Sequence, residues 1–363
     1  MICADYIDPA PEPDEDDDAD DDAPRIDARQ GAAAAHGVRA PAEVAGQRFD
    51  KALAMLVPEH SRARLREWIE SGSATLNGAP AKPRATVVAG DRIEWTEVPT
   101  AADLAYAPEP LPLAIVYEDE SIIVLDKPSG LVVHPGAGNW GGTLLNGLLA
   151  HDPGLASVPR AGIVHRLDAA TSGLMVVART AAAQTNLVRQ LQQRTVTREY
   201  WAIVFGALPE AGTIDAPIAR DPRHPRRFAT SRAAGARHAV TNFRRAALAL
   251  EGAQRFSWAV CRLQTGRTHQ IRVHFESIGH PLVGDPVYRL RRPRVAASER
   301  GAPWDAFPRQ ALHACRLALA HPRDDRRMAW FAAPPADLRA LMKSFRWEDV
   351  DAPVELFDGR SDE

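Results

Sequence analysis

Four strand-like runs in the middle and second half of the chain indicate its fold class. They are rich in Val, Ile and aromatic residues, as β-strands are, and they comprise residues 121–128, 173–180, 198–206 and 256–266. Two segments with a helical pattern, 143–150 and 181–193, lie between them. Because the strands are separated irregularly, with no repeated βαβ unit, we expect a mixed α+β fold.

The composition divides the 363 residues into five segments. Residues 1–44 are rich in Asp, Ala and Pro and hold few large apolar residues, so we expect a disordered acidic tail. A compact module follows at 45–99, and a linker rich in Pro and Ala at 100–113. We expect the main domain at 114–347 and a second tail at 348–363.

The module at 45–99 has local signals for two short helices and a hairpin. Apolar residues recur at helical spacing from Phe49 to Leu56. Ser61 is expected to cap a second helix, which Gly72 ends. The Asn-Gly pair at 77–78 lies between short extended runs, which predicts a two-residue hairpin turn.

The formal net charge of −3 hides a strong asymmetry along the chain. Residues 1–30 hold 12 Asp and Glu against 2 Arg and carry −10, so the remainder carries +7. The segment 219–245 alone holds eight Arg and one acid, and its Pro and Gly content argues against a regular helix, so we expect a loop. A basic body with an acidic tail favours a polyanionic partner.

A lone acid, Asp168, stands between apolar runs in the stretch HRLDAATSGL (165–174). An Asp before Thr, Ser and Gly is typical of a turn or of a helix cap. The flanking sequence is buried-strand material, however, and Arg166 lies beside the acid. An acid held by a cation at such a corner stays ionised and is suited to act as a nucleophile or base.

Three competing interpretations of these motifs are weak. The kinase catalytic loop needs Asp directly after Arg and an Asn five residues beyond, but position 173 is Gly. GAGNWG (136–141) matches a dinucleotide-binding pattern, yet no acid follows about 20 residues on. The twelve His residues and three isolated Cys have no metal-ligand spacing. We therefore expect neither metal nor cofactor.

Two more stretches carry candidate site residues. In LQTGRTHQIRVH (263–274), Arg267 lies in a Gly turn, and Arg272 and His274 alternate with Ile271 and Val273, which is typical of a strand. Tyr200 opens an apolar run in REYWAIV (198–204), where core packing is the common role of a Tyr.

Together these motifs resemble the pseudouridine synthases that act on ribosomal and transfer RNA. KPSGLVVHPG (127–136), HRLDAATSGL, REYWAIV, LQTGRTHQIRVH and GHPLVGDPVY (279–288) occur in that family's order and at its approximate spacing. The resemblance is greatest to the D type of the branch that modifies large-subunit ribosomal RNA. The module at 45–99 is similar to the small RNA-binding module first described in a small-subunit ribosomal protein.

This resemblance implies a pseudouridine synthase fold with a mixed, largely antiparallel sheet and a small α/β RNA-binding domain before it. It implies that Asp168 is the catalytic acid, that Tyr200 stacks on the target base and that Arg272 pairs with Asp168. Arg166 is expected to support the acid. The isomerisation of uridine needs no oxidation and no energy input, so the expected absence of a cofactor is consistent with it.

Basic residues in both parts are expected to contact RNA phosphates. They are Arg48, Lys51, Arg62, Arg66, Arg226, Arg227 and Arg267. The expected partner is ribosomal RNA or a pre-ribosomal particle.

We expect a cytoplasmic monomer without a membrane span, because no run of 18 apolar residues and no signal sequence occur. Two alternatives stay open: a catalytically silent RNA-binding or assembly factor of the same fold and, more remotely, a dehydrogenase.

Overall fold

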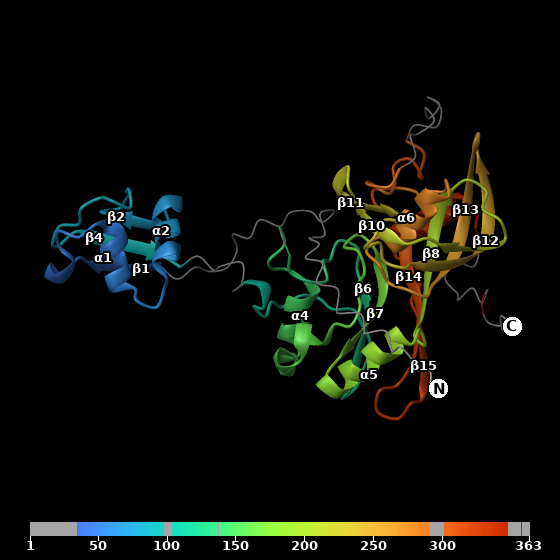
Figure 1. The fold of residues 1–363 in the computed structure, drawn as a ribbon, viewed down its shortest axis with the longest axis horizontal. Coiled ribbons are helices and arrows are strands. Elements are labelled where there is room, and N and C mark those ends of the chain that lie inside the picture. The colour runs from blue at the N-terminus through green and yellow to red at the C-terminus, as the bar shows by residue number, and fades with distance from the viewer. Residues whose placement is uncertain (1–34, 98–103, 137, 290–300, 348–356, 358–363) are drawn as a thin grey trace, which may run out of the picture. The chain divides into compact units, whose positions relative to one another are not determined.

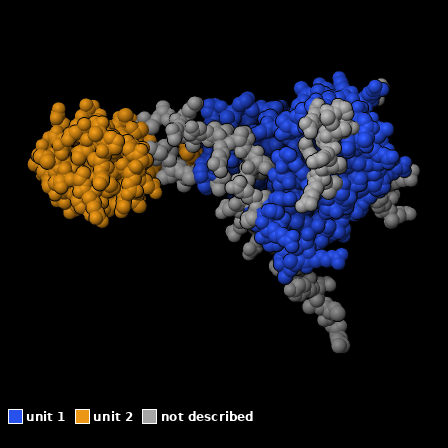
Figure 2. All heavy atoms as spheres, turned by 90° about the horizontal axis from the view of Figure 1, so that it is seen from above, with its two compact units in different colours: residues 1–26, 106–363 blue, residues 27–105 orange. Residues whose placement is uncertain are grey.

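The computed structural model describes residues 35–97, 104–136, 138–289, 301–347 and 357 (Figure 1). The chain divides into two compact units (Figure 2). The small unit comprises residues 27–105, and the large unit comprises residues 1–26 and 106–363. The division at residue 105 falls inside the segment 100–113, which the sequence identifies as a linker.

The small unit packs two helices against an antiparallel sheet with the strand order β1-β4-β2-β3. Phe49, Leu65, Trp68 and Ile93 are buried in its core. Its elements are β1 (Ala35–Arg39), the 3-10 helix η1 (Ala42–Val44), α1 (Phe49–Leu56), α2 (Arg62–Ser71), β2 (Ala74–Leu76), β3 (Ala79–Pro80) and β4 (Arg92–Thr96).

The local signals in this unit are confirmed. The Ser61 hydroxyl accepts a hydrogen bond from the backbone N–H of Arg64 (3.3 Å) and so caps α2. Gly72 ends that helix with a φ of 80°. Asn77 and Gly78 have φ values of 54° and 76°, and both positions of a type I′ hairpin turn need positive φ.

The acidic tail predicted for residues 1–44 is too long. Residues 1–34 lie outside the described part of the chain, but Ala35–Arg39 form β1, which pairs with β4 from Ala35–Thr96 to Arg39–Arg92. Ala42–Val44 form η1, in which Val44 is buried. Residues 35–44 therefore belong to the small unit.

The large unit is built on a nine-stranded sheet with the order β5-β6-β7-β14-β8-β13-β12-β9, to which β15 adds by pairing with β14. Only β7 and β14 pair in parallel, so the predicted mixed, largely antiparallel sheet is confirmed. The strands are β5 (Ile115–Glu118), β6 (Ile122–Lys127), β7 (Ser172–Ala178), β8 (Thr197–Phe205), β9 (Ala211–Asp215), β12 (Val240–Glu251), β13 (Gln254–Leu263), β14 (Leu312–Ala320) and β15 (Arg327–Phe331).

Helices cover this sheet on both faces. Successive residues of a strand point to opposite faces, so neighbouring residues of one strand pack against different helices. Tyr200 of β8 packs in the same cluster as residues of α4 and α6, whereas Trp201 packs with residues of α7. The remaining elements are α4 (Leu144–His151), η2 (Pro153–Ser157), η3 (Pro159–Gly162), α5 (Ala181–Gln192), β10 (Ile218–Asp221), β11 (His224–Thr230), α6 (Gln270–Ser277) and α7 (Ala336–Ser344).

The strand predicted around Arg272 is wrong, because Gln270–Ser277 form helix α6. Ile271 and Phe275, one helical turn apart, are buried in the core. Arg272 and His274 are also fully buried, with polar partners. The alternation of polar and apolar residues therefore does not separate a solvent face from a core face.

Two segments predicted as irregular have more structure than expected. In the basic segment 219–245, β10 and β11 form a two-stranded hairpin and β12 begins at Val240. The second half of the linker packs on the large unit: Asn146 of α4 donates a hydrogen bond to the Ala107 carbonyl (2.8 Å), and Glu109 accepts one from Gly142 N–H (2.9 Å).

Candidate active site

Asp168 lies in a tight turn that leads directly into β7. The backbone N–H of Thr171 closes this turn by donating to the Asp168 carbonyl (2.9 Å). The next carbonyl, that of Ala169, accepts hydrogen bonds from Gly130 N–H and from the Lys127 ammonium, both at 2.8 Å. Segments far apart in the sequence therefore fix the backbone beside the carboxylate.

Lys127 is a fully buried cation that organises this turn. Its Nζ donates to three carbonyls, those of Pro128 (2.9 Å), Leu131 (2.8 Å) and Ala169 (2.8 Å). An ammonium group has three protons, so every donor is used. The KPSGL segment is thus tied to the turn that carries Asp168.

Arg272 of α6 is held between two aspartates. Its Nη1 lies 3.1 Å from Oδ2 of Asp168. Its Nε and Nη2 bind the two carboxylate oxygens of Asp285 at 2.7 and 3.0 Å, which is the bidentate geometry that a planar guanidinium favours. The Arg272 side chain is 1% exposed and that of Asp168 is 18% exposed. Asp285 thus anchors a guanidinium whose Nη1 faces Asp168.

The electrostatic surroundings keep Asp168 ionised. Burial raises the pKa of the Asp168 carboxyl, but the positive charges of His269 and Arg272 outweigh this effect. The charge of Arg166 and the hydrogen bond from Arg272 lower the pKa further. The net result is a pKa below the ordinary value, so Asp168 is a carboxylate at neutral pH.

His269 and Tyr288 extend this network to the basic hairpin. The Tyr288 hydroxyl accepts a hydrogen bond from the backbone N–H of Phe228 on β11 (3.0 Å) and lies 2.9 Å from Nδ1 of His269. The fully buried Tyr288 ring also lies against the Arg272 guanidinium, 4.9 Å from its carbon to the ring centroid. One tyrosine therefore contacts two of the three groups that lower the pKa of Asp168.

Tyr200 lies in the middle of β8, which pairs with β13 and β14, and is 5% exposed. Burial raises the pKa of its hydroxyl, the Arg198 charge lowers it, and the Asp168 charge raises it. The phenol is therefore neutral, and it lies within electrostatic reach of Asp168. Arg166 is partly buried. Burial, followed by the charges of Arg166 and Arg160, lowers the pKa of His134 to about 4.

The residues expected to bind RNA lie in both units. In the small unit Arg48, Lys51, Arg62 and Arg66 are all exposed; Arg48 pairs with Asp50 (2.6 Å) and Arg66 with Glu70 (2.8 Å).

In the large unit, Arg227 pairs with Glu276 (2.7 Å) and lies over the Tyr288 ring. Arg267 is partly buried and donates to the His238 carbonyl (3.3 Å). The side chain of Arg226 lies outside the described part of the structure.

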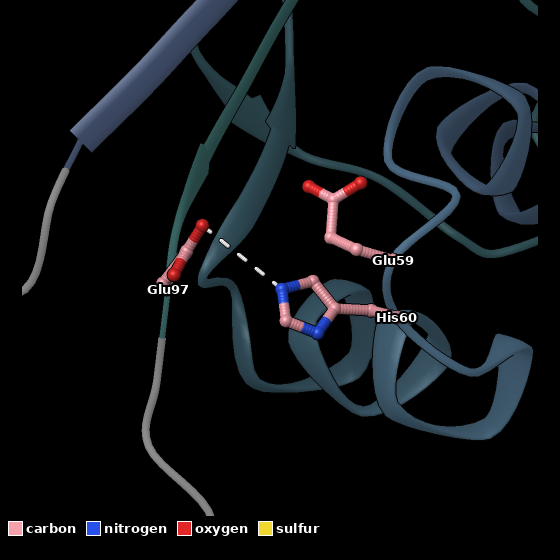
Figure 3. Close-up of side chains that lie close together, drawn as sticks. All are labelled: Glu59, His60 and Glu97. Carbon is pink, nitrogen blue, oxygen red and sulfur yellow. Dashed lines mark ion pairs between the residues drawn. The ribbon is translucent and has the colours of Figure 1, made fainter.

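One group of three potential metal-ligating side chains occurs among the described residues, in the small unit (Figure 3). The donor atoms of Glu59, His60 and Glu97 lie within 4.8 Å of one another. The His60 ring pairs with Glu97 (4.0 Å) and packs edge-on against Trp68. Glu59 is exposed and the other two are partly exposed, so we interpret the group as surface ion pairing.

Several site residues were not identified as such from the sequence. Lys127, Asp285 and Tyr288 all lie in the quoted motifs, and His269 is in one of them too, but none was assigned a role. A buried lysine and a buried aspartate are rare unless they are paired, so their position next to strand-like runs is the available signal. Their partners are distant in the sequence and only the fold reveals them.

Comparison with known proteins identifies close relatives. A family model described as RNA pseudouridylate synthase matches residues 121–277, which include Asp168, Tyr200 and Arg272. The ribosomal large subunit pseudouridine synthase D of Neisseria meningitidis serogroup B is 48% identical over 312 residues, covering 86% of this chain and 82% of that protein. The protein of that name from Xanthomonas campestris pv. campestris is 50% identical over 323 residues, covering 87% and 94%.

A solved structure, human RNA Pseudouridylate Synthase Domain Containing 1, is similar with a TM-score of 0.50 and 27% identity. The match covers 65% of this chain and 89% of that one. In the described part of the chain, no helix is long and apolar enough to cross a bilayer.

Proposed function

Because the chain belongs to the RNA pseudouridylate synthase family, we propose that it isomerises uridines of large-subunit ribosomal RNA to pseudouridine. The observation that carries the proposal is an ionised Asp168 held by the buried, doubly anchored Arg272. Relatives that are 48% and 50% identical bear the name of the ribosomal large subunit, which supports ribosomal RNA, free or in a pre-ribosomal particle, as the substrate.

The reaction moves one bond and leaves the composition unchanged. The C1′–N1 bond of uridine breaks and its electron pair stays on the uracil. The base then turns, C5 bonds to C1′, the C5 proton leaves and N1 gains a proton. No oxidant, reductant or nucleotide is consumed, so positioned acid–base groups suffice.

Asp168 is the proposed catalytic residue. A carboxylate beside the sugar is suited to attack C1′, as in retaining glycosidases, or to remove the C2′ proton and give a glycal. Addition to C6 of the base is a third route for the same group. All three need the ionised form, which Arg272 maintains in the ground state and Arg166 supports.

Tyr200 is the proposed platform for the target base. Extracting a base from its stack costs a few kcal/mol, and stacking on an aromatic face returns about 1–3 kcal/mol. The neutral phenol on β8 lies within electrostatic reach of Asp168, which suits a base whose sugar lies at the carboxylate.

The basic residues supply affinity for the RNA backbone. We assign phosphate contacts to Arg48, Lys51, Arg62, Arg66, Arg226, Arg227 and Arg267, which position the RNA without reading its sequence. We also propose a cytoplasmic monomer: one chain holds Asp168, Tyr200 and Arg272, and the free thiols of Cys261 and Cys315 suit a reducing compartment.

Replacing Asp168 tests the function directly. Asp168→Asn keeps the shape of the side chain and removes its charge, so single-turnover conversion of ribosomal RNA should fall to background while RNA affinity persists. Pseudouridine mapping in cells that lack this chain should show unmodified uridine at the positions that wild-type protein converts in the assay. Expression of wild-type protein in those cells should restore pseudouridine at these positions. Wild-type protein that binds RNA but converts none would favour the silent assembly factor. Conversion of uridine by Asp168→Asn above background would show that Asp168 is not the catalytic residue.

A further inference from the structure

Arg198 is a buried cation without a hydrogen-bonding or ionic partner among the described residues. Three arginines among the described residues are at most 9% exposed: Arg198, Arg272 and Arg309. Arg272 binds two aspartates, and Arg309 binds Asp337 and backbone carbonyls. The described residues offer the Arg198 guanidinium no hydrogen bond and no ion pair, and its Nε is completely buried.

A buried, unpaired charge is costly, so such a group points to a ligand that completes it. Arg198 and Tyr200 are two residues apart on β8, point to the same face of the sheet and lie about 7 Å apart along the strand. A Cβ placed on Gly266 would lie 2.9 Å from Nη1 of Arg198. The guanidinium therefore fills the space that this glycine leaves in the turn before α6.

His165 presents a second unpartnered donor near Arg198. Its Nε2 accepts a hydrogen bond from the backbone N–H of Val176 (3.1 Å), so the proton of the neutral ring is on Nδ1. This Nδ1 is buried and has no partner in the part of the chain that the structure describes. Burial, followed by the Arg198 charge, lowers the His165 pKa to about 3 and keeps the ring neutral. Two neighbouring side chains thus offer N–H groups and no acceptor.

We propose that Arg198 is the counter-ion of the uracil that detaches from C1′, donating N–H groups to a carbonyl oxygen of that base. The proposal rests on the function proposed above and adds a residue to it. When the C1′–N1 bond breaks, the electron pair left on the uracil spreads over its carbonyl oxygens. Asp168 acts on the sugar, Tyr200 lies along the base, and Arg198 follows next on the same strand face.

A phosphate is the other anion in this substrate, and burial argues against it. Arg48, Arg62 and Arg66, which are assigned to phosphates, are exposed, and Arg227 and Arg267 are partly buried, whereas Arg198 is 9% exposed on the core face of the sheet. A phosphate carries its charge throughout the reaction, so its partner contributes to affinity. The uracil anion exists only after bond cleavage, so its partner contributes to the rate.

The test compares wild-type protein, Arg198→Met and Arg198→Lys in single-turnover assays over a range of RNA concentrations. We expect Arg198→Met to lower the saturating rate about 100- to 1000-fold, as the loss of one preorganised donor to a developing anion does, with little change in the half-saturating RNA concentration. Lysine keeps the charge without the planar fork and should recover part of the rate. Arg323→Met, at an exposed arginine, is the control and should match wild type.

Two further measurements separate this role from a structural one. Arg198→Met should unfold at the wild-type temperature or higher, because it removes an unpaired buried charge. The second measurement uses RNA with 5-fluorouridine at the target position and follows the rate at which this nucleotide is consumed. The ratio of the wild-type rate to the Arg198→Met rate should be smaller on this RNA than on RNA with uridine, because fluorine itself stabilises the detached base.

Each contrary outcome has a distinct meaning. Weaker RNA binding at an unchanged saturating rate would assign Arg198 to a phosphate, and a lowered unfolding temperature with an equal rate loss on both RNAs would assign it to the fold. Either result would overturn the inference about Arg198. The proposed function would still stand, provided that wild-type protein converts uridine in the same assay. Wild-type protein without turnover would overturn the function and, with it, this role of Arg198.

Discussion

Arg272 of the large unit and two arginines of the small unit, Arg48 and Arg66, have opposite surroundings. In the large unit the Arg272 side chain is 1% exposed and lies between Asp168 and Asp285. In the small unit Arg48 and Arg66 are 51% and 62% exposed, and each pairs with a carboxylate nearby in sequence. The same guanidinium therefore has a fixed geometry in one unit and a solvated, adjustable one in the other.

This difference indicates what each charge can do. A buried pair is screened little by salt and sets the protonation state of its partner, but it must keep its geometry. An exposed pair contributes at most about 1 kcal/mol to stability and exchanges its partner readily. The large unit is thus suited to control a carboxylate, and the small unit to exchange local carboxylates for RNA phosphates.

The largest expected effect comes from breaking the buried pair. Arg272→Met leaves Asp285 buried without its cation, which should cost about 3–5 kcal/mol of unfolding free energy, and turnover should be abolished. Arg272→Lys should be intermediate, because it keeps the charge but loses the bidentate contact. Denaturant unfolding and single-turnover rates measure both effects.

The pH profile of the Lys variant sharpens this test. The pKa of Asp168 is lowered in the folded protein. The stability that the ionised carboxylate contributes is therefore fully present above the ordinary carboxyl pKa, and it is lost as the pH falls through the lowered pKa. Weakening the Arg272 contact raises that pKa, so the acid limb of the rate profile should move to higher pH. A fully active Arg272→Met protein, or an unmoved limb in Arg272→Lys, would show that the pairing is incidental.

A smaller effect is expected from Tyr288→Phe, which keeps the ring beside Arg272 and removes the hydroxyl. The Phe228 N–H then loses its acceptor and His269 loses its hydrogen bond to the hydroxyl, at a cost of about 1–3 kcal/mol in unfolding free energy. We expect the saturating rate to fall roughly tenfold, because His269 is displaced from Asp168, while RNA affinity changes little. A loss of affinity without a loss of rate would mean that Tyr288 supports only the hairpin.

The two units also differ in how well the sequence predicts them. In the small unit, helix α2 and the Asn77–Gly78 turn depend on local signals, so their positions were predictable. Strand β1 was not, because its residues are mostly exposed and lack an apolar pattern. It is stabilised by pairing with β4, more than 50 residues later.

In the large unit the four runs that form β6, β7, β8 and β13 were predictable, and so were the candidate residues, but the other strands and the contacts between elements were not. The pairing of Arg272 with Asp168 followed only from the family resemblance, since 104 residues separate them. Helix α6 was mistaken for a strand because its polar residues are buried with distant partners. That Arg198 has no hydrogen-bonding or ionic partner among the described residues is likewise a property of the fold.

The smallest expected effect is at the exposed arginines of the small unit. Arg62→Gln/Arg66→Gln removes two proposed phosphate contacts from α2. Each contact contributes about 0.7–0.9 to the slope of log affinity against log salt, so the slope should become shallower by roughly 1.4–1.8. Unfolding should change by well under 1 kcal/mol, because the Arg66–Glu70 pair is exposed.

The saturating rate of this double variant should equal that of wild type, because Asp168, Tyr200 and Arg272 are unchanged. RNA binding titrated at several salt concentrations, with Arg323→Gln as an exposed control in the large unit, measures the slope. An unchanged slope would mean that these arginines keep their own partners when RNA binds. A lowered saturating rate would mean that the small unit contributes to chemistry, and the contrast between fixed and solvated arginines would not divide the two tasks.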